Sequence, residues 1–230
     1  MEFRKGSEFS FRELYGKYIQ ILDKNQAESL VKPMELDDGE VFRQIDCDME
    51  VNSIFVYCYI DHHAGMSFQV LTVGLYEDGR NRIHERTDFK SMIKFRKDLF
   101  NNLDACVLED DSYFDENYGE YVRDHEKFFT NPQLEKIRNL QAIDSIRDDM
   151  FPDDILVIFF KEGLQNEGMW VRLERMDDDL PVVNDELGQF PLLYGELLNQ
   201  PNQDFGVNVG DSVRVLVIKY EDGDELAFAV

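Results

Sequence analysis

The stretch SIFVYCYIDHHAGMSFQVLTVGLY, residues 53–76, specifies a β-hairpin in the first half of this chain. Residues 53–61 and 66–76 are rich in Val, Ile, Phe and Tyr, which is the composition of β-strands. The tetrapeptide HHAG between them ends on Gly65, and glycine tolerates the positive φ of a tight turn. The stretch therefore predicts two antiparallel strands joined by a short turn.

The residues on either side extend this hairpin into a meander. Residues 40–46 have the composition of a preceding strand, and the tripeptide EDG at 77–79 predicts a further turn. Nearer the N-terminus, Ser10 and Glu13 have the spacing of a helix capping box. Apolar residues then recur at steps of three and four, so we expect a first helix over residues 10–23.

Helical periodicity returns after residue 87. Apolar stripes at 89–103, 118–129 and 134–146 predict three helices, and Asn131 followed by Pro132 is a typical helix start. We therefore expect residues 1–149 to form an α+β domain, built from an N-terminal helix, an antiparallel meander and further helices.

After residue 149 the pattern becomes one of short strands alone. Gly, Pro, Asn and Asp separate five candidate strands, at 155–161, 169–176, 192–198, 212–220 and 225–230. Closure would protect the edges of so small a sheet, so residues 150–230 are predicted to form a small five-stranded β-barrel-like domain. The fold class expected for the whole chain is α+β, in two domains.

The charge of the chain limits its partners. There are 48 acidic and 24 basic residues, a formal net charge of −24, yet 43% of the residues are hydrophobic, as in a folded protein. Excess negative charge disfavours nucleic-acid phosphate and anionic lipid, and no run of Lys and Arg is longer than two residues. We expect a basic protein partner, no direct nucleic-acid or membrane partner, and leave the oligomeric state open.

Cysteine usage and the first residues indicate the compartment. Cys47, Cys58 and Cys106 form no CxxC pair, so reduced and mostly buried thiols are expected. The N-terminal residues lack the apolar core of a signal peptide, and no apolar run is long enough for a membrane helix. The prediction is a cytoplasmic protein.

No motif assigns a catalytic or cofactor-binding residue. There is no G-x-S-x-G elbow and no phosphate-binding glycine loop, so no cofactor is expected. His62, His63 and Cys58 are weak candidates for a metal site, because their side chains are zinc ligands. A polar hairpin tip is the favoured interpretation, since adjacent strand residues point to opposite faces. The acidic runs at 109–111, 148–154 and 177–179 are likewise interpreted as solvated loops.

Trp170, the single tryptophan, is the first candidate for a partner-binding residue. A buried position is the favoured alternative, because a tryptophan also fills a small core efficiently. The other candidates are aromatic and acidic residues of one segment, namely Tyr113, Tyr118, Tyr121, Asp110 and Asp111.

Three C-terminal segments carry a resemblance. They are MWV at 169–171, GELLNQP at 195–201 and GDSV at 210–213. The region from about residue 150 to residue 230 resembles small bacterial domains of unknown function. In these domains a strand with a tryptophan, a G-x-L-x-N-x-P motif and a G-D-x-V motif recur together. Similar domains occur near bacterial toxins and mobile elements, so the resemblance implies an immunity protein.

These observations favour a non-enzymatic acidic binding module, in its sharpest form an immunity or inhibitor protein for a basic partner. Two alternatives remain open. One is a metal-assisted hydrolase that uses carboxylate and histidine side chains, and the other is a structural subunit of a homo- or hetero-oligomer.

Overall fold

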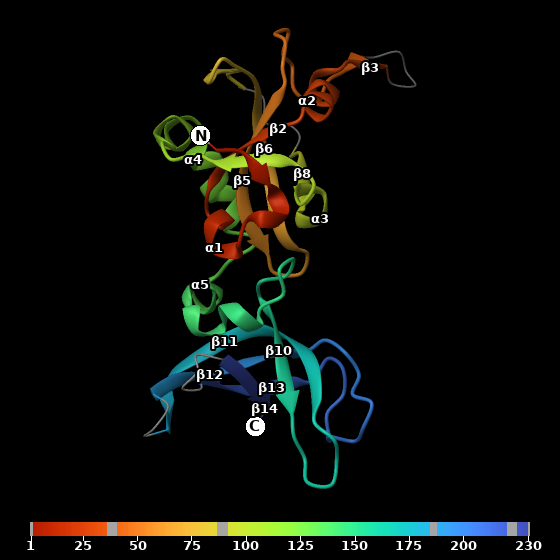
Figure 1. Ribbon diagram of the computed structural model, residues 1–230, viewed down its shortest axis with the longest axis vertical. Coiled ribbons are helices and arrows are strands. Elements are labelled where there is room, and N and C mark those ends of the chain that lie inside the picture. The colour runs from red at the N-terminus through yellow and green to blue at the C-terminus, as the bar shows by residue number, and fades with distance from the viewer. Residues whose placement is uncertain (1, 36–40, 87–91, 185–187, 220–224, 230) are drawn as a thin grey trace. The chain divides into compact units, whose positions relative to one another are not determined.

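The computed structural model describes residues 2–35, 41–86, 92–184, 188–219 and 225–229. The chain forms two compact units, Met1–Phe129 (unit 1) and Thr130–Val230 (unit 2). Helices and strands occur in both, so the fold is α+β, as predicted (Figure 1). The predicted domain boundary at 149/150 lies within unit 2, because the helix after Asn131 packs on a barrel strand.

Unit 1 is built on an antiparallel sheet. Its elements are β1 (Arg4–Lys5), η1 (Gly6–Glu8), α1 (Phe11–Leu14), β2 (Tyr18–Leu22), α2 (Lys24–Val31), β3 (Met34–Glu35), β4 (Val41–Phe42), β5 (Ser53–Asp61), β6 (Gly65–Glu77), β7 (Arg80–Ile83), β8 (Lys94–Arg96), α3 (Lys97–Phe100), β9 (Asp104–Val107) and α4 (Ser112–Glu126). The main sheet has the order β1-β9-β2-β5-β6-β7, and β8 pairs with β6.

Both faces of this sheet are covered, which is why its central strands β5 and β6 are buried along most of their length. One core contains Leu14 of α1, Leu30 of α2 and Phe100 of α3. The other contains aromatic residues of β2 and β5 packed against Phe114 and Tyr118 of α4. Figure 1 shows α3 and α4 on opposite sides of the sheet.

The predicted helix over residues 10–23 is wrong beyond Leu14. The capping box does form, and the Ser10 backbone N–H donates to Glu13 Oε2 at 2.8 Å. The helix ends after one turn, and Gly16 has a φ of 71°. The following residues form β2, which is hydrogen-bonded to β5 and β9. A strand buried on both faces lacks the polar–apolar alternation of a half-exposed strand, and residues 18–22 are apolar except for Gln20, so their pattern also fits a helix.

The hairpin over residues 53–76 is confirmed. Ser53–Asp61 pairs antiparallel with Gly65–Glu77, and Gly65 has a φ of 78°.

In contrast, the helix predicted from the stripe at 89–103 is wrong. The described part of that segment contains β8 and the short helix α3 and ends just before β9, while residues 87–91 lie outside the described residues.

Unit 2 is a closed barrel with two helical segments. Its elements are α5 (Pro132–Asn139), η2 (Gln141–Ile146), β10 (Asp154–Phe159), β11 (Glu167–Asn184), β12 (Gly188–Leu197), β13 (Ser212–Lys219) and β14 (Glu225–Ala229). Successive strands pair antiparallel, and β10 closes the barrel by pairing parallel with β14. The closing pair is parallel because an up-and-down meander of five strands begins and ends in the same direction. The predicted five-stranded barrel is confirmed.

The barrel core extends into the helical segments. Asn131 Oδ1 accepts from the backbone N–H groups of Gln133 and Leu134 at 2.9 and 3.0 Å, which confirms the predicted helix start. Ile137 of α5 and Ile143 of η2 are fully buried in the same core as the barrel interior. Neither these helices nor any other helix of the described ranges is long and apolar enough to cross a membrane.

Candidate functional site

The outer surface of the β10–β11 hairpin carries exposed apolar side chains. Buried residues of β10 alternate with Leu156, which is 41% exposed, and Phe160 beyond the strand end is 69% exposed. Trp170 pairs with Leu156 across the hairpin and is 36% exposed. We call Leu156, Phe160 and Trp170 the apolar strip. Exposed apolar side chains that adjoin one another, as those of Leu156 and Trp170 do across the hairpin, are typical of binding surfaces.

A pocket opens beside Trp170. Its volume is about 220 Å³, and we call it the Trp170 pocket; its lining residues are Asp148, Phe151, Asp154, Trp170, Leu198 and Asn199. Two aromatic rings and one leucine supply apolar wall, while two carboxylates and one amide supply polar groups. Apolar walls with a few placed polar groups are the usual composition of binding pockets.

Local hydrogen bonds fix the wall of this pocket. The backbone N–H of Trp170 donates to Asn199 Oδ1 at 2.8 Å, and the backbone N–H of Leu198 donates to the Trp170 carbonyl at 2.9 Å. On the other side, Asp148 Oδ1 accepts from the backbone N–H groups of Met150 and Phe151 at 2.9 and 2.8 Å. The pocket is therefore preorganised rather than assembled on binding.

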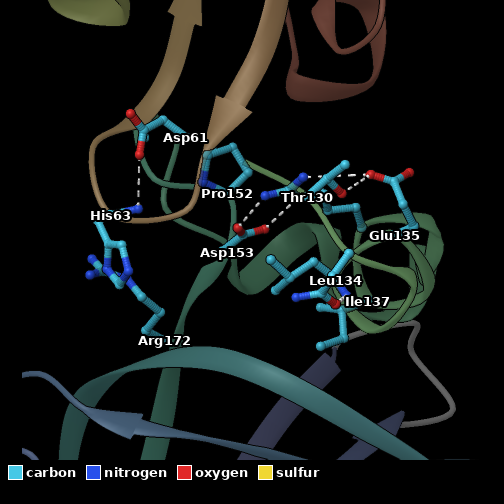
Figure 2. A network of polar contacts seen from close by, with 12 residues as sticks. Asp61, His63, Thr130, Leu134, Glu135, Ile137, Pro152, Asp153 and Arg172 are labelled. Carbon is cyan, nitrogen blue, oxygen red and sulfur yellow. Dashed lines mark hydrogen bonds and ion pairs between the residues drawn. The ribbon is translucent and has the colours of Figure 1, made fainter. Parts of the chain in front are cut away.

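The described residues that line the pocket include two carboxylates and no cation. Asp153 is paired with Arg138, and Asp154 is paired with Arg172 through two bonds of 2.8 and 2.9 Å. Figure 2 shows Asp153 in this network of unit 2. Burial raises the pKa of Asp154, and the paired Arg172 opposes that rise. Asp148, by contrast, has no ion-pair partner among the described residues.

These positions correct two interpretations made from the sequence. Trp170 lies at the surface, where the favoured alternative placed it in the core. Asp153 and Asp154 are buried and paired rather than solvated. Phe151 and Asn199 line the pocket but were not among the predicted site residues, although Asn199 lies in the GELLNQP segment at 195–201.

The other candidate residues lie on and before α4 in unit 1. Asp110 and Asp111 are exposed, and hydrogen bonds from the Ser112 hydroxyl and backbone N–H lower the pKa of Asp110. Tyr113 is 38% exposed and remains available to a partner. Tyr118 is 2% exposed and packs in the core, so its assignment as a partner-binding residue is corrected. Tyr121 is partly buried against the same core.

The metal-site candidates are not assembled in unit 1. His62 and His63 occupy the hairpin turn with ring centroids 5.0 Å apart, and Asp61 Oδ1 accepts from the His63 backbone N–H at 3.2 Å (Figure 2). Cys58 is fully buried in the core, where burial raises the pKa of its thiol. Within the described ranges, no three His, Cys, Asp or Glu side chains form a group that could hold a metal ion. All three cysteines are free and buried, as predicted.

His125 is a buried residue of α4. Its ring lies 4.9 Å from that of Tyr59 and 4.7 Å from that of Phe129, measured between centroids. Neither ring nitrogen has a hydrogen-bond partner among the described residues. Burial lowers the pKa of His125 below its ordinary value of 6.5; Lys94 also lowers it, and Asp61 opposes them.

The stability of unit 1 is expected to decrease as the pH falls below about 6.5. The unfolded chain then binds a proton at His125 more readily than the folded chain does, which favours unfolding. Urea unfolding between pH 5 and 7, followed by resolved methyl resonances of unit 1, measures the effect. A His125→Leu variant should lose this dependence, whereas His63→Gln, at an exposed turn position, should keep it. Equal dependence in both variants would contradict the assignment to His125.

Comparison with known proteins gives no relative from which to transfer a function. No family model, curated protein or solved structure matches the chain.

Proposed function

We propose that this protein is a non-enzymatic binding module for a basic protein, and that the Trp170 pocket with its apolar strip is the contact surface. The observation that supports this most directly is the exposure of Trp170 beside a preorganised pocket. Tryptophan is the residue type most enriched among the energetically dominant contacts of protein interfaces. Trp170 is not among the residues of the buried barrel core, so filling that core does not explain it.

The charge of the chain supports a basic partner. A net charge of −24 repels acidic proteins and accelerates the encounter with positively charged ones. The exposed residues Asp110 and Asp111 near Tyr113 add acidic surface in unit 1. Charge thus provides long-range attraction, while the apolar strip provides short-range contact.

The sharpest form of the proposal is an immunity or inhibitor protein that covers a functional cleft of its basic target. It is supported by the acidic charge and by the resemblance of residues 150–230 to small bacterial domains near toxin genes. Inhibition by occupation requires affinity and shape, and it needs no catalytic residue in the inhibitor.

The first experiment is affinity capture of proteins from a lysate of the source cells. The full-length wild type and the Trp170→Ala variant are immobilised in parallel. We expect a basic protein to be retained at low salt by the wild type and released as salt is raised, because screening weakens charge attraction. After purification, that protein should bind the Trp170→Ala variant at least about 30-fold more weakly, the effect of losing about 2 kcal/mol at a dominant contact.

Phe128→Ala is the matched control, because Phe128 is an 83% exposed aromatic residue of unit 1 outside the pocket. It should bind the partner as the wild type does. Retention of no protein, or of the same proteins by wild type and Trp170→Ala, would refute the proposal that this surface binds a partner.

A further inference from the structure

We propose that the Trp170 pocket accepts one arginine or lysine side chain from the partner, with the cation lying against the aromatic rings of Trp170 and Phe151 and beside the carboxylate of Asp148. This inference rests on the proposed function and specifies the chemistry of its central contact. It is supported by three features: the residues that line the pocket, the Oδ2 atom of Asp148, which accepts no hydrogen bond from a described residue, and the size of the pocket.

The lining selects for positive charge. A cation is attracted to the face of an aromatic ring, most strongly to tryptophan, and paired aromatic walls are a known means of binding charged nitrogen groups. Asp148 and Asp154 add carboxylates to the same wall. An anionic side chain would be repelled here, and an apolar one would remove water from Asp148 without replacing its hydrogen bonds.

Asp148 is the carboxylate available to such a cation. Its Oδ1 accepts two backbone N–H bonds, and Oδ2 accepts no hydrogen bond from any described residue. The neighbouring Asp154 is already neutralised by Arg172, and the charge of Asp148 raises the pKa of Asp154 by repulsion. A cation beside Asp148 would therefore relieve repulsion between two carboxylates as well as form a new ion pair.

The size of the pocket favours a side chain over a free small molecule. A volume of about 220 Å³ lies below the roughly 300–1,000 Å³ that is usual for small-molecule sites. The pocket also adjoins the exposed Leu156 of the apolar strip, which pairs with Trp170 across the hairpin. A small cation bound in the pocket would leave the Leu156 side chain exposed to water. A protein surface that presents one basic side chain would occupy the pocket and cover the strip together.

The test uses the full chain and Nα-acetyl-arginine amide as the probe, with Nα-acetyl-citrulline amide as its uncharged isostere. Trp170 is the single tryptophan of the chain, so its fluorescence reports on this pocket alone. At constant ionic strength, the arginine probe should bind at least about tenfold more tightly than the citrulline probe. Equal affinities, or no response to either probe, would overturn the inference.

Asp148→Asn is the decisive variant, because an asparagine Oδ1 can still accept the two backbone bonds that hold the local turn. It should lose most of the tenfold preference for the charged probe. Asp149→Asn removes the same charge from an exposed neighbour that does not line the pocket, and it should keep the preference. Equal loss in both variants would show that general charge, rather than the pocket, selects the cation.

The two proposals can fail separately. If Trp170→Ala abolishes capture of a partner while the arginine probe shows no preference, the binding surface stands and the cation inference is wrong. If the probe binds with the expected preference while Trp170→Ala leaves partner capture unchanged, the pocket chemistry stands and the proposed function of this surface is wrong.

Discussion

Replacing Arg138 with leucine is expected to lower the free energy of unfolding of unit 2 by about 3–5 kcal/mol. The Arg138 side chain is 1% exposed, and it donates to the two carboxylate oxygens of Asp153 at 3.0 and 2.7 Å. The Asp153 side chain is itself only 2% exposed. The variant would leave this carboxylate buried without its cation, and removing one member of a buried pair costs far more than removing both.

Urea unfolding followed by the fluorescence of Trp170 measures this change, because the tryptophan lies in the same unit. Arg214→Leu is the control: it removes the same charge from an exposed strand position and should change stability by no more than about 0.5 kcal/mol. The double variant Arg138→Leu/Asp153→Leu should recover most of the loss. A single variant within about 1 kcal/mol of the wild type would show that the pair does not support the unit.

Replacing Phe68 with alanine is expected to destabilise unit 1 by about 3–5 kcal/mol. Phe68 is fully buried on β6, and its ring stacks on Phe100 with centroids 4.1 Å apart and on Phe95 at 5.4 Å. Removing the ring takes away these contacts and leaves a cavity that the surrounding sheet cannot close. The cost is the lost burial together with the cavity.

Urea unfolding followed by methyl resonances of unit 1 gives the difference in stability. Phe68→Leu keeps part of the contact and should cost clearly less than Phe68→Ala. Phe128→Ala removes an exposed ring and should leave stability within about 0.5 kcal/mol of the wild type. The same cost for Phe68→Ala and Phe128→Ala would mean that this core does not determine the stability of unit 1.

Local patterns predicted the elements whose structure depends on their own residues. The hairpin at 53–76 was visible because strand composition flanks a turn with a glycine at positive φ. The start of α5 was visible because Asn131 caps it. The five barrel strands were visible because turn residues separate short apolar runs.

Predictions that depended on which faces are covered failed. The segment at 18–22 is apolar at nearly every position, and only its pairing with β5 and β9 distinguishes a central strand from a helix. Tyr118 and Trp170 are both aromatic residues in regular elements, yet α4 buries one and the barrel exposes the other. The stripe at 118–129 marked an apolar face of α4, but no local pattern specifies which other element covers a face.

The sequence by itself determined the α+β class, the closed barrel, the acidic surface and the absence of a recognisable catalytic motif, because composition, turns and caps act over a few residues. The tertiary structure alone decided that Asp153 is buried against Arg138, and that Asp148 and Trp170 line one pocket. The residues of that pocket are separated along the chain by turns and strands. Their meeting depends on the pairing of β11 with both β10 and β12, which is set by the sum of many contacts rather than by any one segment.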